Sequence, residues 1–154
     1  MLRRLTTMLL ALATVPGASA QVLQKSALTL EGAKRVLAAA ESEARRQNFP
    51  CSIAIVDDGG NLLIMERLDD WIVASASVSI GKARTSAIFR RPTSDFETII
   101  KNGRTAMVAL NDFTPLQGGV PITYGGKVIG AIGASGGSGS QDDVISLAGA
   151  AALK

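Results

Sequence analysis

The spacing of apolar and polar positions divides most of the chain into short helical and extended segments. Between positions 30 and 47, apolar residues recur every three or four positions and charged residues lie mostly on the other face, which predicts an amphipathic helix. Thr29 has the residue type and the position of its N-cap. The apolar, β-branched run 51–56 and the segment 62–66 flank the turn sequence Asp-Asp-Gly-Gly-Asn and together predict a β-hairpin.

The second half of the chain predicts three further helices and a second hairpin. The helices are expected at 72–89, 95–101 and 141–153, and the hairpin strands at 120–123 and 127–134. The segment 106–116 fits either a short strand or a turn of helix. The resulting order, α-ββ-α-α-ββ-α, predicts an α/β (α+β) fold in which helices pack on an antiparallel sheet.

Individual side chains refine these expectations. Ser94 and Glu97 have the spacing of a capping box at the start of the third helix. Pro121 has no backbone N–H to donate, so its strand is expected at an edge of the sheet or to begin there. The second helix is expected to pack closely through its small residues Ala74, Ser77, Gly81 and Thr85. The C-terminal helix is expected to contribute to the core through Val144, Ile145, Leu147, Ala148 and Ala151.

The first twenty residues have the three-part organisation of a secretory signal peptide. Two arginines near the N-terminus precede the apolar run 8–15 and the small-residue cleavage sequence Ala18-Ser19-Ala20. We therefore expect cleavage before Gln21, a periplasmic or secreted location, and one mature domain over 21–154. The apolar run is too short to remain as a membrane-spanning helix, so stable membrane insertion is not expected.

Composition and charge exclude several classes of protein. The 154 residues are 47% hydrophobic and 19% charged, which is too apolar for a disordered chain. One cysteine and no histidine exclude an intrachain disulfide and histidine-based metal or nucleophile chemistry, and no metal site is expected. Loss of Arg3 and Arg4 leaves 14 basic and 13 acidic residues, a net charge of +1 that indicates no nucleic-acid partner. Cys51 opens an apolar run, which favours a buried, unreactive thiol.

The glycine- and serine-rich segment 133–140 is the strongest candidate for a ligand site. It leads into a helix at Gln141 and Asp142, where backbone N–H groups and the helix dipole favour an anion such as a carboxylate. The alternative is a flexible connection in which Asp142 caps the helix and takes the place of the anion. The sequence matches neither a Walker A loop nor a dinucleotide-binding motif.

Other candidate residues lie in a second glycine segment and among the cations. The segment 117–122 places paired glycines before a proline, which suits either a backbone wall against a ligand or a tight turn. Arg67, Lys82 and Arg84 would pair with an acidic ligand if they lie near a pocket. Each of these cations is also typical of a solvated surface.

Six segments of the sequence carry a resemblance to a known family. They are LTLEGA at 28–33, IAIVDDGG at 53–60, RLD at 67–69, SIGKARTSA at 79–87, GGVPI at 118–122, and GAIGASGG at 130–137 with Gln141-Asp142. In this order they resemble the GlcG/HbpS-like family of haem-binding or haem-degrading proteins, which is related to the C-terminal domain of PduO-type proteins. The resemblance covers about residues 28–153.

The resemblance implies a profilin-like domain with a central antiparallel sheet and helices on both faces. It also implies homo-oligomers built from dimers, up to octamers, and a ligand site near the two glycine segments with the Lys82 helix nearby. Some secreted members of the family bind haem and take part in iron or redox sensing. Others are encoded among genes for small organic acids and have no settled activity.

The glycine segments, the cations and the resemblance together predict one ligand site. Its expected residues are Arg67, Lys82, Arg84, Thr85, Gly118, Gly119, Pro121, Ile122, Ser135, Gly136, Gly137, Gln141 and Asp142. The lack of histidine departs from the haem-binding pattern, because an iron ligand would have to be Met, Cys, Lys, Tyr or a weak oxygen donor such as Thr. Haem would still find apolar surface for its faces and Arg or Lys for its propionates.

Three functions follow from these observations. The first is a secreted, oligomeric protein that binds haem or a related small acidic molecule. The second is an enzyme acting on a small organic acid, with Lys82 or Asp142 as acid or base. The third is a structural or partner-docking oligomer without a ligand, which the lack of a concave site near both glycine segments would favour.

Overall fold

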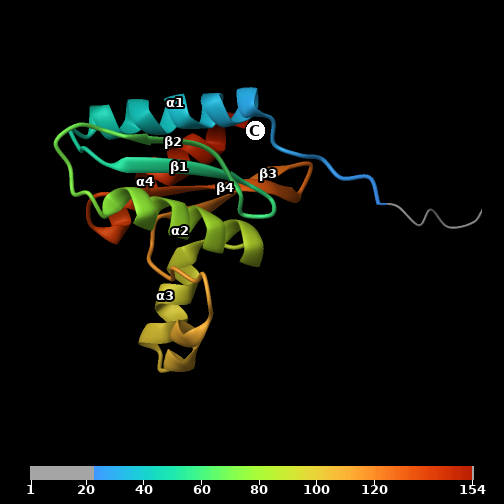
Figure 1. The fold of residues 1–154 in the computed structure, drawn as a ribbon, viewed down its shortest axis with the longest axis vertical. Coiled ribbons are helices and arrows are strands. Elements are labelled where there is room, and N and C mark those ends of the chain that lie inside the picture. Colours follow the sequence, from blue (N-terminus) through green and yellow to red (C-terminus); the bar gives the residue numbers. More distant parts are fainter. Residues whose placement is uncertain (1–22, 154) are drawn as a thin grey trace, which may run out of the picture.

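Both predicted hairpins form and join into one sheet. β1 (Ser52–Asp57) pairs with β2 (Leu62–Arg67), and β3 (Gly119–Tyr124) pairs with β4 (Lys127–Ser135), all antiparallel. β1 also pairs with β4, so the strand order is β2-β1-β4-β3 (Figure 1). Pro121 lies in β3 at the edge of the sheet, as its missing N–H predicts.

A computed structural model describes residues 23–153 of the chain. The predicted signal peptide lies outside this range. Among the helices within it, none combines the length and hydropathy that crossing a membrane requires.

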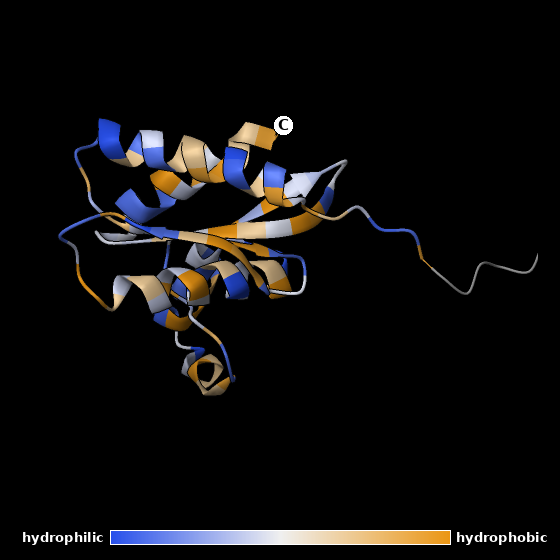
Figure 2. Cartoon of the chain, turned by 45° about the horizontal axis from the view of Figure 1, so that its top comes forward, coloured by the Kyte–Doolittle hydropathy of each residue, from blue (hydrophilic) through white to orange (hydrophobic). Residues whose placement is uncertain are grey.

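The helices cover both faces of the sheet, which confirms the expected layers. α1 (Leu30–Arg46) and α4 (Gly139–Ala150) pack together on one face, and α2 (Ser75–Phe89) packs on the other (Figure 1). α3 (Thr93–Lys101) projects away from the sheet beyond α2 (Figure 1). Orange colour along the strands in Figure 2 shows the apolar layer that the helices enclose.

Small residues allow α2 to approach the sheet closely. Gly133 of β4 lies directly under α2, and a Cβ there would stand 2.6 Å from the backbone nitrogen of Ala83. Next to it, Ala83, Ala87, Val56 and Ala131 form the buried contact between the helix and the strands. The opposite face holds the larger core, in which isoleucines of the strands meet α1 and α4.

Several predicted helix starts differ from the structure. α2 begins at Ser75 rather than at position 72. α3 begins at Thr93, directly after Pro92, so the predicted capping box is wrong. The Glu97 carboxylate instead accepts hydrogen bonds from Lys101 Nζ and from a backbone N–H of the loop before β3. α4 begins at Gly139, two residues earlier than predicted. The 3₁₀ turn Thr105–Ala109 overlaps the start of the segment 106–116, for which the sequence left strand and helix open.

Some apolar side chains expected in the core face outward. Val144 is 44% exposed and Leu147 53%, although Ile145 is fully buried as predicted. Ala151 is also exposed. The small-residue stripe of α2 is only partly correct, because Thr85 is buried but Ala74 and Ser77 are exposed. The helix instead buries Ser75, Ser79, Lys82, Ala83, Ser86 and Ala87.

Candidate functional site

Lys82 of α2 and Asp142 of α4 form a buried ion pair. Lys82 Nζ lies 2.7 Å from Asp142 Oδ2, and it donates a second hydrogen bond of 3.0 Å to the carbonyl oxygen of Ala134 in β4. The two side chains are 4% and 3% exposed. Because water is largely excluded, each charge depends on the other and on its hydrogen bonds for solvation.

The second carboxylate oxygen of Asp142 binds the start of α4. Asp142 Oδ1 accepts a 3.0 Å hydrogen bond from the backbone N–H of Gly137. The N-cap of the helix is Ser138, which forms a capping box with Gln141. The Asp142 carboxylate therefore occupies the position near the start of α4 where the sequence predicted a bound anion. The N-cap of the helix is Ser138 and not Asp142.

Gly118 and Gly119 pack against this ion pair. Gly118 has φ +118°, and a Cβ there would lie 2.7 Å from Asp142 Cβ. A Cβ on Gly119 would meet the side chain of Thr93, whose Oγ1 accepts a 2.8 Å hydrogen bond from the Gly119 N–H. Both glycines allow close packing around the ion pair, and neither lines the two cavities at α1–β2 and at the end of β4, so their contact with a ligand stays a prediction.

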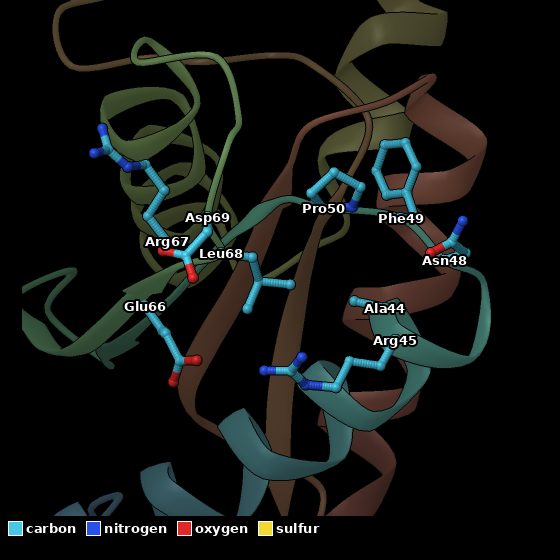
Figure 3. Close-up of a pocket in the computed structure, with 9 residues that line it drawn as sticks. All are labelled: Ala44, Arg45, Asn48, Phe49, Pro50, Glu66, Arg67, Leu68 and Asp69. Atoms are coloured by element: carbon cyan, nitrogen blue, oxygen red, sulfur yellow. The ribbon is translucent and has the colours of Figure 1, made fainter.

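A cavity of about 540 Å³ opens between the C-terminal end of α1 and the end of β2 (Figure 3). It is lined by Ala44, Arg45, Asn48, Phe49, Pro50, Glu66, Arg67, Leu68 and Asp69. Four of these nine side chains are apolar and four are charged. Such a mixture gives a ligand both apolar surface and fixed polar contacts.

The charged side chains of the cavity do not all face it. Arg45 and Glu66 extend into the space between α1 and β2, whereas Arg67 points away (Figure 3). Arg45 Nε donates a 2.9 Å hydrogen bond to Glu41 Oε1. This contact, the attraction of the Glu41 charge, and the more distant charges of Glu66 and Asp69 raise the pKa of the Arg45 guanidinium.

A smaller cavity of about 180 Å³ lies at the end of β4. It is lined by Ile72, Ala74, Ser75, Val78, Ser135, Gly136 and Gly137. Trp71 packs edge-on against Phe49 of the larger cavity, with ring centroids 5.6 Å apart, and its Nε1 approaches Gly136 of the smaller one. That buried Nε1 has no hydrogen-bond partner among residues 23–153. Trp71 is therefore close to both cavities.

Lys82, Asp142, Gly118 and Gly137 meet around the buried ion pair, and the other residues predicted for the ligand site lie in separate places. Arg67 borders the larger cavity, and Ser135–Gly137 border the smaller one. Arg84 is exposed and faces Asp112 at 3.5 Å. Thr85 is buried and accepts a hydrogen bond from the Thr114 N–H. Four others support the fold: Pro121, Ile122, Gln141 and Asp142. Their contact with a ligand stays a prediction.

Of the nine residues that line the larger cavity, only Arg67 was predicted from the sequence as a site residue. Arg45 looks like one of several charges on the solvent side of a helix, and Phe49 follows the end of that helix. Glu66 and Asp69 look like ordinary surface acids. The usable signal is the Asn-Phe-Pro sequence at 48–50, where an aromatic residue stands between a helix stop and a strand.

The single cysteine is buried, as predicted. Cys51 has no exposed surface and forms no disulfide. Burial raises the pKa of its thiol to about 12, and the nearby Asp142 charge adds to the shift. The thiol is therefore protonated at neutral pH.

Replacement of Lys82 by methionine is expected to destabilise the chain by about 3–5 kcal/mol, because Asp142 would remain buried without its cation. The double variant Lys82→Met with Asp142→Asn is expected to recover part of this loss, since the amide oxygen still accepts from the Gly137 N–H. Urea unfolding followed through Trp71 measures both effects.

Lys101→Met provides the matched control for this measurement. Its ion pair with Glu97 has the same N–O distance of 2.7 Å but a largely exposed lysine, so a loss below about 1 kcal/mol is expected. Equal losses for the Lys82 and Lys101 variants would contradict a structural role for the buried pair.

The sequence model of the HbpS-like family, described as haem degrading protein HbpS-like, matches residues 28–151. Protein GlcG of Escherichia coli K12 is 44% identical over 111 residues, which cover 72% of this chain and 83% of GlcG. A double mutant of HbpS from Streptomyces reticuli is 32% identical with a TM-score of 0.81, covering 94% of this chain and 99% of that structure.

A third comparison connects the fold with a bound group in a similar protein. The PduOC:heme complex is 25% identical with a TM-score of 0.77, covering 84% of this chain and 96% of that structure. The fold, the family match and the identity to GlcG agree over nearly the whole described range. The chain therefore belongs to the HbpS-like family.

Proposed function

We propose that the chain binds haem or a related small acidic molecule in the larger cavity, between α1 and β2. The cavity itself carries the proposal, because its volume of about 540 Å³ is typical of small-molecule sites. Membership of the HbpS-like family and the likeness to the PduOC:heme complex support haem as the first ligand to test.

The cavity fits the organic part of haem but not its iron. Phe49, Pro50 and Leu68 offer apolar surface to a flat ring, and Arg45 offers a guanidinium to a propionate carboxylate. The nine lining residues include no His, Cys, Met or Tyr, which are the usual ligands of haem iron. We therefore assign the iron no ligand among them.

The alternative of an enzyme with Lys82 or Asp142 as acid or base finds no support in the geometry. Both side chains line neither cavity, and they are hydrogen-bonded to each other. A general acid or base must come within hydrogen-bond reach of its substrate. A structural role accounts for both residues.

Haemin added to the mature chain is expected to quench the fluorescence of Trp71 in a saturable way, because the only tryptophan packs against Phe49 at the cavity. Arg45→Ala is expected to weaken binding about tenfold, since a hydrogen bond to a charged group contributes about 1.5–3 kcal/mol and Arg45 already shares its charge with Glu41. A fluorescence titration measures both constants.

Arg91→Ala is the matched control, because Arg91, just before α3, also pairs with an acid four residues away, Asp95. Its haemin affinity is expected to equal that of the unaltered chain. A linear, non-saturable loss of fluorescence would contradict binding at a defined site. An equal loss in both arginine variants would place the site elsewhere.

We also propose that the protein is exported and loses residues 1–20. The charged start, the apolar run and the small-residue cleavage sequence support this. The mass of the exported protein is expected to match a chain beginning at Gln21. An exported chain that retains Met1 would contradict the cleavage.

We further propose a homo-oligomer built from dimers, with the outer side of α4 at a contact between copies. Val144 and Leu147 lie one helical turn apart and are exposed despite being apolar. The double variant Val144→Asp with Leu147→Asp is expected to lower the mass measured by light scattering by at least half. Leu30→Asp, at a similarly exposed leucine of α1, is expected to leave it unchanged.

A monomeric mass for the unaltered chain would contradict the oligomer. An unchanged mass for the α4 variant would contradict this placement of the contact.

A further inference from the structure

The lining of the larger cavity offers a ligand three kinds of contact. Phe49, Pro50 and Leu68 provide apolar surface, Arg45 provides a cation, and Glu66 provides a carboxylate that extends into the same space (Figure 3). Carboxylates suit hard cations and N–H donors, whereas haem iron is usually held by histidine, thiolate, thioether or phenolate. The side chains of the lining therefore suit the organic part of a ligand better than a haem iron.

Side chains outside the lining do not add an iron ligand to the larger cavity. Met65 precedes Glu66 in β2, and neighbouring residues of a strand point to opposite faces, so Met65 lies on the other side of the sheet from the cavity. The Cys51 thiol is fully buried. The smaller cavity is lined by apolar side chains, serine and glycine.

A second copy of the chain would not supply the most common iron ligand either. The full sequence contains no histidine, so no assembly of this chain alone brings an imidazole to the cavity. Recognition then rests on the faces of the ligand ring and on its acidic side chains.

We propose that the larger cavity recognises a tetrapyrrole through its ring and carboxylates and not through a bound metal. This rests on the proposed function and names its ligand class more closely. Metal-free protoporphyrin IX has the same ring edge and the same two propionates as haem. It should therefore bind as tightly as haemin, within about threefold.

The test compares haemin with protoporphyrin IX on the same mature chain. Both are titrated against Trp71 fluorescence, and Arg45→Ala and Arg91→Ala are titrated beside the unaltered chain. The expected result is two similar dissociation constants, both weakened to the same extent by Arg45→Ala and neither changed by Arg91→Ala.

A second readout examines the iron directly. Imidazole added to the haemin complex is expected to shift the absorption spectrum without releasing haemin, because no protein side chain has to leave the iron. Met65→Leu and Tyr124→Phe, which remove exposed thioether and phenol groups, are expected to leave both the spectrum and the affinity unchanged.

The outcomes separate this inference from the proposed function. Haemin binding that is tenfold or more tighter than protoporphyrin IX binding would overturn metal-independent recognition while leaving haem binding intact. A spectrum altered by Met65→Leu or Tyr124→Phe would do the same and would identify the ligand. Failure of both molecules to saturate would overturn haem binding, and with it this inference, and would leave only a different small acidic molecule as the ligand.

Discussion

The attraction between Lys82 and Asp142 connects the two helix layers that the sheet would otherwise keep apart. α2 and α4 lie on opposite faces, and their charges meet beside Ala134 at the end of β4. Burying two charges is costly unless hydrogen bonds replace water, and here a carbonyl oxygen and a backbone N–H do so. The close packing around this ion pair also requires glycine at position 118, because a side chain there would collide with Lys82 and Asp142.

The buried ion pair and the proposed ligand site therefore lie in different parts of the molecule. The segments richest in glycine surround the ion pair, where the chain must pass close to itself. The larger cavity instead forms where α1 ends and β2 runs into a loop, and its lining combines residues at the margin of the core, such as Phe49 and Leu68, with the exposed arginine Arg45. Residues at such element ends can vary with little cost to the fold.

The sequence predicts the elements well because periodicity is local, and both hairpins and all four α-helices occur within a few residues of their predicted positions. It fails where tertiary contacts decide. Ser94 has the capping spacing, but Pro92 lets the helix begin earlier and Glu97 turns to the loop before β3. Lys82 and Asp142 are sixty positions apart, and the sequence around each residue does not indicate that the other is its partner. The acids and arginine of the larger cavity resemble ordinary surface charges until the fold brings them together.

The strand order also determines how the chain can fold. Each hairpin is local, whereas the central ladder between β1 and β4 joins segments separated by α2 and α3. Hairpins form within microseconds, but closing a long loop first costs conformational entropy that only later contacts recover. We therefore expect the slow step of folding at the central ladder, where Ile55 pairs with Ile132, rather than within either hairpin.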